Sequence, residues 1–176
     1  MGARRTALVL AIVAGVLGSS EAASAGPVVT SADKLRAGVV AQMNSVRAAH
    51  GLRALTVRPR LQNAGAAHVG DLAKHGQFTH SWSNGTPFGT WIGWYWPGPG
   101  FGSWSAGENL FWAGPITTAK AVVTAWLASP GHRQNLLNRS WRAVGVGAVR
   151  MAGPIGDFAG VPTAFLVSAE FGRRTG

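Results

Sequence analysis

Apolar residues recur every three or four positions in the first part of the chain. Leu35, Val39, Met43 and Val46 follow this spacing, and Gly51 comes after them. One face of an α-helix repeats every 3.6 residues, so the spacing predicts an amphipathic helix that begins near residue 33. The helix is expected to end at Gly51, because glycine readily adopts the left-handed conformation that closes many helices.

A second segment has the same spacing and is rich in small residues. Leu61, Ala64, Ala67 and Leu72 recur within residues 60–74, which predicts another helix. Alanine and glycine carry little or no side chain, so this helix is expected to pack closely against its neighbour. A third helix is predicted from residue 117 or 118 to Leu127.

Two runs near the C-terminus have the composition of strands. They are Ala143 to Val149 and Thr163 to Phe171, with a Gly/Pro-rich turn between them. Helices followed by strands, without regular alternation, favour an α+β domain in which helices cover a small antiparallel sheet.

Residues 82–104 show neither a helical nor a strand period, and we interpret them as an irregular insertion. Glycine and proline alternate there with five of the chain's eight tryptophans. Aromatic rings combine apolar area with a polar edge, so these tryptophans either form a platform for sugar rings or lipid, or cover one end of the core. The residues concerned are Trp82, Trp91, Trp94, Trp96 and Trp104, together with Tyr95.

The N-terminus has the order of a secretory signal peptide. Two arginines precede an apolar run over residues 7–17, and the small residues Ala23-Ser24-Ala25 follow. The apolar run is shorter than the roughly 20 residues that span a bilayer, so we expect cleavage after Ala25 and a secreted, extracellular protein. Residues 26–31 would then be a short leader, and residues 32–176 one domain with no transmembrane span.

Composition restricts the chemistry and the partners. The chain has no cysteine, which excludes thiol mechanisms and disulfides. Its formal charge of +10 favours acidic partners such as anionic cell-wall polymers, lipid headgroups or acidic glycans. Nucleic acid is not expected as a partner of an exported chain without a binding motif, and we expect a monomer.

Three residues with ionisable side chains lie in distinctive short motifs. These are His80 in Phe-Thr-His-Ser, Glu108 in Gly-Glu-Asn-Leu, and His132 in Ser-Pro-Gly-His-Arg-Gln-Asn. With Asn44-Ser45-Val46-Arg47 upstream and Phe171-Gly172 downstream, these words in this order resemble the CAP superfamily of cysteine-rich secretory, antigen 5 and pathogenesis-related proteins. The resemblance is to the cysteine-free bacterial members, often called SCP-like extracellular proteins, and it runs from about Leu35 to Gly172.

The resemblance implies an α-β-α sandwich of the CAP type with a surface cleft that holds two histidines and two acidic residues. His80, Glu108 and His132 match three of the four. The fourth, a glutamate after the tryptophan of the third helix, has no counterpart, because Leu127, Ala128 and Ser129 follow Trp126.

Two imidazoles and one carboxylate also make a reasonable ligand set for zinc. His80, Glu108 and His132 are therefore candidate metal ligands, although no cofactor is required by the sequence. The other interpretation is structural: Glu108 accepts backbone hydrogen bonds, Asn109 forms a turn, and His132 begins a helix. The remaining histidines, His50, His68 and His75, are interpreted as surface or packing residues.

The leading hypothesis is a secreted, non-enzymatic module that binds an extracellular ligand in a cleft. The cleft would be formed by His80, Glu108, His132, Asn109 and Ser129. Proteins that the chain resembles have been linked to lipids and to other proteins, so a lipid-like, wall-derived or protein ligand is expected.

Two alternatives belong to other classes. In the first, Zn²⁺ bound by His80 and His132 activates water for hydrolysis, and Glu108 serves as a ligand or base. The absence of a second acid in the cleft disfavours this enzyme. In the second, the tryptophan-rich insertion binds carbohydrate or cell wall without any chemistry in the cleft.

Overall fold

The computed structural model describes residues 26–175, which form one five-stranded sheet with helices on both faces. The strand order is β1-β4-β5-β3, with antiparallel neighbours, and the short β2 pairs with β4 in parallel. The signal peptide predicted for residues 1–25 lies outside the described residues. The strands are β1 (Val28–Ser31), β2 (Thr56–Val57), β3 (Ser103–Ala113), β4 (Ala143–Ala152) and β5 (Thr163–Thr175).

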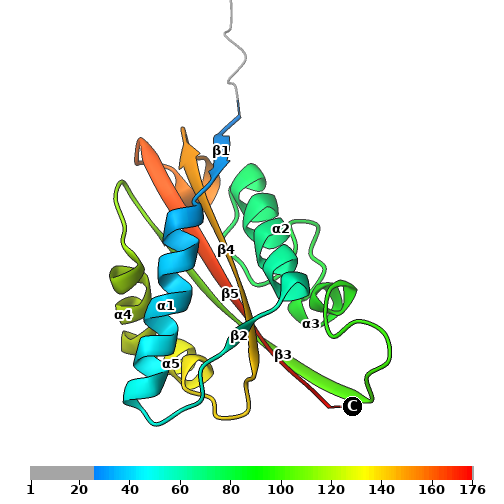
Figure 1. The fold of residues 1–176 in the computed structure, drawn as a ribbon. Helices are drawn as coiled ribbons and strands as arrows, with labels where there is room; N and C mark the ends of the chain where they lie inside the picture. The colour runs from blue at the N-terminus through cyan, green and yellow to red at the C-terminus, as the bar shows by residue number, and fades with distance from the viewer. Residues whose placement is uncertain (1–25, 176) are drawn as a thin grey trace, which may run out of the picture.

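The helices form two layers. α1, α4 and α5 lie on one side of the sheet, and α2 and α3 lie on the other (Figure 1). This arrangement confirms the predicted α+β sandwich. The α-helices are α1 (Asp33–Ala49), α2 (Pro59–His75), α3 (Phe88–Trp91), α4 (Ala119–Ala128) and α5 (Pro130–Leu136), and short 3₁₀ helices span Ile92–Trp94 and Gly156–Phe158.

Alternation along the central strands gives the two faces of the sheet different characters. On β5, Val167, Ala169 and Phe171 belong to the core beneath α1 and α4. Successive strand residues point to opposite faces, so Ser168 and Glu170 face α2. The two faces of β5 therefore differ: its residues on the α1 side are apolar, whereas the middle of its α2 side carries polar groups.

α2 lies unusually close to the sheet. A Cβ atom at Gly145 would collide with the backbone of Leu61, and one at Gly147 would collide with the carbonyl group of Gly65. The glycines of β4 thus allow α2 to approach backbone to backbone, which agrees with the close packing predicted from its small residues. α2 ends at Gly76, which has the left-handed conformation with φ of 64°.

Three expectations from the sequence need correction. Residues 28–31 are not a free leader but strand β1, which pairs with β4 from Val28↔Ala152 to Ser31↔Val149. The strand β3 escaped prediction because glycine and polar residues interrupt its apolar pattern. The insertion at residues 82–104 is partly helical, over Phe88–Trp94.

None of the helices within residues 26–175 combines the length and apolarity needed to cross a bilayer.

Candidate functional site

Glu108 is the centre of a cluster of ionisable residues on the edge strand β3. Its side chain is only 1% exposed, and each carboxylate oxygen accepts a hydrogen bond from a different histidine. Oε1 lies 2.6 Å from Nδ1 of His68, and Oε2 lies 2.5 Å from Nδ1 of His80. Burial alone would raise the pKa of Glu108, but the hydrogen bonds from the two histidines outweigh it and hold this pKa below its ordinary value.

His80 presents its ring to solvent from the loop after α2. Its side chain is 56% exposed, and Trp91 Nε1 donates to its backbone carbonyl at 2.9 Å. The hydrogen bond with Glu108 raises the pKa of His80, against a smaller lowering by burial. Because Nδ1 is bound to the carboxylate, Nε2 is the ring atom available to a ligand.

His68 completes the cluster from the inner face of α2, although the sequence analysis placed it among surface or packing residues. It is fully buried against Trp82 and Trp91, whose ring centroids lie 5.7 and 4.4 Å from its own. Its Nε2 lies 3.2 Å from the carbonyl oxygen of Ser81. The two ring nitrogens of His68 thus face two acceptors, a carboxylate and a backbone carbonyl.

The signal that identifies His68 is its position. It lies seven residues after Leu61 and four before Leu72, on the apolar stripe of α2, and a buried histidine needs a polar partner.

His132 reaches the same strand from the opposite layer. It lies in α5, and its backbone carbonyl accepts a hydrogen bond of 3.0 Å from Asn109 Nδ2. Asn135 in turn donates to the backbone carbonyl of Glu108 at 3.0 Å. Burial, and then the positive charge of His80, lowers the pKa of His132. The two histidines thus approach the open edge β3 from the two sides of the sheet.

Asn109 and Ser129, which were expected to line the cleft, make hydrogen bonds that join elements of the fold. Asn109 is completely buried, and its side chain bonds both the carbonyl of His132 and the amide of Asn135, so it joins α5 to β3. Ser129 is the residue between α4 and α5, and its backbone accepts from Arg133 and donates to Ala125. The turn predicted at Asn109 is not formed, because this residue lies within β3 and pairs with Ala169.

A second acid does lie beside Glu108, and the sequence analysis missed it. Glu170 on β5 is the cross-strand partner of Glu108 and is fully buried. Its carboxyl oxygens have no hydrogen-bond partner among the described residues. Burial, and then the negative charge of Glu108, raises the pKa of Glu170 well above its ordinary value. A lone glutamate in the apolar run Thr163 to Phe171 was the available signal.

The structure brings together a candidate metal-binding group that differs from the predicted one. Within residues 26–175, the group whose ligand atoms lie within 4.8 Å of one another is His68, Glu108 and Glu170, not the predicted group with His80 and His132. In that buried group, the oxygen and nitrogen of the Glu108–His68 pair already bond each other. Zinc binding at His80 and His132 therefore stays a prediction, with Glu108 orienting His80 from behind.

The tryptophans of the insertion divide between core and surface. Trp91 and Trp96 are buried, whereas Trp94 is 56% and Trp104 is 41% exposed. Trp94 packs edge-on against Trp82 at 5.7 Å, and Trp82 stacks on His68. An aromatic surface thus continues from the histidine cluster to solvent.

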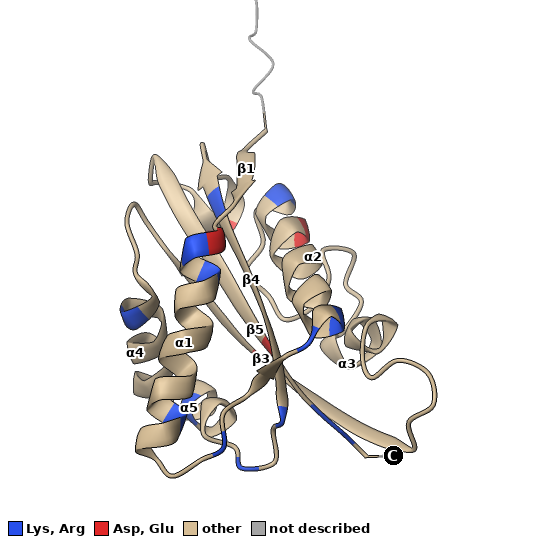
Figure 2. Cartoon of the chain, viewed as in Figure 1, with Lys and Arg blue, Asp and Glu red and all other residues tan. Residues whose placement is uncertain are grey.

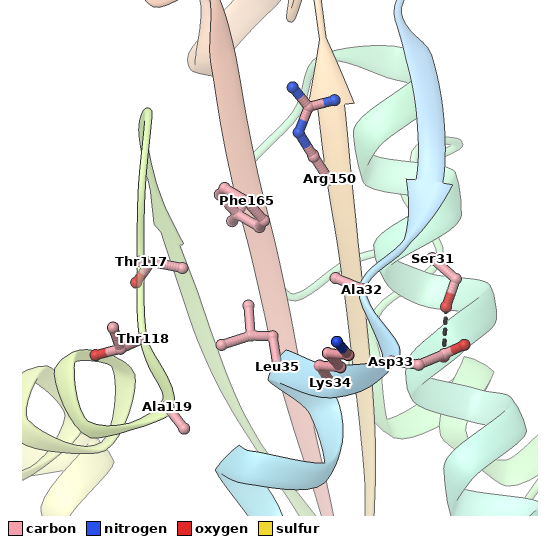
Figure 3. A pocket seen from close by; sticks show the side chains of 10 residues that line it. All are labelled: Ser31, Ala32, Asp33, Lys34, Leu35, Thr117, Thr118, Ala119, Arg150 and Phe165. Atoms are coloured by element: carbon pink, nitrogen blue, oxygen red, sulfur yellow. Dashed lines mark hydrogen bonds between the residues drawn. The ribbon is translucent and has the colours of Figure 1, made fainter.

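A hollow of about 580 Å³ lies away from this cluster, between the start of α1 and the start of α4 (Figure 3). Leu35, Phe165 and Ala119 line its apolar part, and Lys34 and Arg150 add positive charge.

Similarity to known proteins agrees with this architecture. The model of the CAP family, described as the cysteine-rich secretory protein family, matches residues 40–154. The uncharacterized protein YkwD of Bacillus subtilis is 34% identical over 112 residues, which are 63% of this chain and 41% of YkwD. The chain thus spans about two fifths of that relative's length.

Solved structures share the fold at low identity. An extracellular protein with an SCP domain from Bacillus anthracis has a TM-score of 0.59 at 23% identity, over 79% of this chain and 40% of its own. An outer surface protein of Borrelia burgdorferi has a TM-score of 0.68 at 19% identity, over 85% of this chain and 99% of its own. Because the family model matches more than half of the sequence, this chain belongs to the cysteine-rich secretory protein (CAP) family.

Proposed function

We propose that the protein is an exported, non-enzymatic module that binds an extracellular ligand beside His80 and His132. The observation that carries this proposal is the geometry of Glu108. Its two oxygens hold His68 and His80 by Nδ1, so the exposed ring of His80 is fixed in orientation with Nε2 available. Nε2 accepts a hydrogen bond when the ring is neutral and donates one when the ring is protonated, a form that the raised pKa of His80 favours. An oriented ring nitrogen of this kind suits recognition of a ligand hydroxyl, carboxylate or phosphate group.

The surroundings of His80 define the rest of the ligand. Phe78 is 39% exposed two residues away, and Trp94 reaches the cluster through Trp82. These rings offer apolar area next to a polar imidazole, which suits an amphipathic molecule or a sugar. The ligand class is therefore lipid-like or wall-derived.

Hydrolysis is less well supported by the same geometry. Both oxygens of Glu108 already accept hydrogen bonds, so this carboxylate is not free to act as a base toward water. Glu170 is buried and its raised pKa favours the neutral form, which does not accept a proton at neutral pH.

Tryptophan fluorescence tests the proposal. Purified protein is titrated with lysophosphatidylglycerol micelles and, separately, with soluble peptidoglycan fragments. We expect one of these probes to change the emission, with at least about fivefold weaker binding in His80→Ala and His132→Ala. His75→Ala, on the exposed end of α2, serves as the matched control. Equal binding by all four proteins would refute a site at these histidines.

Calorimetric titration with Zn²⁺ tests the metal alternative with the same variants. Uptake by the wild type and the His75→Ala control, but not by His80→Ala or His132→Ala, would favour a zinc centre. Identical uptake by all variants would exclude these histidines as its ligands.

The hollow in Figure 3 offers a second candidate position for a lipid-like ligand. Its apolar lining with Lys34 and Arg150 nearby suits an acyl chain with an acidic headgroup. Leu35→Trp would fill this space. If it abolishes the micelle response while His80→Ala does not, the apolar part of the ligand binds here.

A further inference from the structure

Three hollows follow one another around the end of the molecule where α2 and β4 begin and β5 ends. Their volumes are about 320, 170 and 160 Å³. The first two share Arg58, Trp96 and Arg174, and the second and third share Arg173. We call this succession the arginine groove. The arginines that line it are Arg58, Arg60, Arg142, Arg173 and Arg174.

Two of these arginines are held in place by the fold. The guanidinium of Arg174 lies 3.9 Å from the ring centroid of Phe101 and 5.0 Å from that of Trp96, and it donates to the carbonyl of Pro97 at 3.0 Å. Arg142 donates to the carbonyl of Arg139 at 2.7 Å. Stacking and carbonyl bonds fix these charges without neutralising them.

The charge of the groove has no internal counterpart. Within residues 26–175, one arginine forms an ion pair with a carboxylate. This pair, Arg36–Asp33, lies at the start of α1 and not in the groove. The guanidinium groups of Arg58 and Arg173 have no hydrogen-bond partner in the same part of the chain. Figure 2 shows blue segments gathered at the start of α2, at the start of β4 and near the end of β5, in the lower half of the view.

The N-terminus of α2 adds a second source of positive potential. This helix has 17 residues, and its N-cap is Arg58, whose side chain makes no capping bond. The first N–H groups of a helix lack intrahelical partners and attract anions. Pro59 has no N–H group, but Arg60, the next residue of α2, also lines the largest of the three hollows. The free N–H groups of the helix therefore begin at Arg60, beside the other arginines.

We propose that the arginine groove binds a linear phosphodiester polymer with polyol units, at a site separate from the His80 face. Arginine suits phosphate oxygens because its planar fork donates two parallel hydrogen bonds. Hollows linked in succession suit a chain with repeated charges better than a single headgroup. Ser103, Ser105 and Thr175 line the last hollow and provide hydroxyl groups for the polyol. Of the two tryptophans that line the groove, Trp96 is buried and Trp104 is 41% exposed, so a single exposed ring disfavours a base-stacking nucleic acid.

Calorimetry with a synthetic poly(glycerol phosphate) chain tests the proposal. The groove variant is Arg58→Gln/Arg173→Gln, chosen because neither guanidinium has a partner within residues 26–175 whose loss would affect folding. The matched control, Lys74→Gln/Lys120→Gln, removes the same charge from exposed positions elsewhere. Circular dichroism and thermal melting verify that both variants fold.

We expect the groove variant to bind the polymer about tenfold more weakly, and the control about as well as the wild type. Fewer phosphate contacts release fewer counterions, so the dependence of binding on salt should also become less steep in the groove variant. His80→Ala should bind the polymer normally, which separates this test from that of the proposed function.

Several outcomes would overturn the proposal. Equal weakening in the control would mean that binding follows net charge alone. Inorganic phosphate that binds as tightly as the polymer would indicate a single-ion site. Tight binding to phosphatidylglycerol vesicles without binding to the polymer would indicate a membrane surface instead.

Discussion

Glu108 bonds two histidines that differ in solvent exposure, each through its own Nδ1 atom. The ring of His68 is buried, whereas the ring of His80 is more than half exposed. The buried histidine therefore stabilises the carboxylate, and the carboxylate orients the exposed one. The two histidines therefore have different roles because one is buried and the other is exposed.

His68→Ala should destabilise the fold strongly. Removing His68 leaves Oε1 of the buried Glu108 carboxylate without its hydrogen-bond partner, although His80 still bonds Oε2. Breaking a buried pair of this kind costs about 3–5 kcal/mol. For a domain of this size we expect the melting temperature to fall by at least about 6 °C. His75→Ala, at an exposed position of the same helix, should shift it little. Similar melting of both variants would show that the His68–Glu108 pair contributes nothing to stability.

Glu170→Gln should stabilise the protein at pH 7.5. The buried carboxyl group lacks a partner among the described residues, and leaving such a group unpaired costs about 1–3 kcal/mol. Glutamine is neutral at every pH, and its amide N–H can donate to Glu108. Calorimetry should show a melting temperature about 2–12 °C higher than that of the wild type. The difference should disappear near pH 4, where the wild-type carboxyl is protonated in both states, and its persistence there would contradict this explanation.

At the scale of elements, the position of α2 decides where His68 and His80 lie. The helix contacts β4 through Gly65 and Gly147, and the polar residues of the sheet beneath it meet its inner face. α5 holds His132 against β3 through the amides of Asn109 and Asn135. The site is thus assembled by the packing of α2 on β4 and β5 and of α5 on β3.

Gly147→Ala should disturb the close packing of α2 on β4. The added methyl group would collide with the backbone of α2, which cannot move aside as a flexible side chain could. We expect a loss of about 1–3 kcal/mol or more, measured by urea denaturation. In Gly70→Ala the new Cβ has open space, so a change of helix propensity should stabilise by about 0.5–1 kcal/mol. If the two variants change stability in the same direction, close packing does not explain the glycine.

For the molecule as a whole, ionisation of the site links stability to pH. The lowered pKa of Glu108 gives stability that is present above pH 4.5, its ordinary value, and is lost as the pH falls through its folded pKa. The raised pKa of His80 gives stability that is present below 6.5 and is lost as the pH rises through its folded pKa. Glu170 becomes increasingly unfavourable above pH 4.5.

The melting temperature should therefore be highest between about pH 4.5 and 6.5. His132, whose pKa is lowered, acts in the opposite sense below its ordinary value of 6.5 and moves the maximum toward the upper end of this range. Differential scanning calorimetry from pH 4 to 9 checks the expectation, and Glu170→Gln should move the maximum to higher pH. Stability that rises steadily from pH 6.5 to 9 would contradict it.

Local patterns determined much of this molecule. The helices α1, α2 and α4 and the strands β4 and β5 follow from apolar spacing, and the sequence words around His80, Glu108 and His132 identify the family. These features are readable because a helix or a buried strand imposes its own period on the chain, and because Glu108 and His80 sit in short recognisable words.

Only the tertiary structure decided the contacts of the site. Glu108 and Glu170 are 62 positions apart in the chain and become neighbours through the β3–β5 register, and His68 meets Glu108 because glycines in β4 let α2 descend onto the sheet. Residues 28–31 likewise became a strand only because β4 offers an unpaired edge. Such contacts depend on which elements pack together, and no local period encodes that choice.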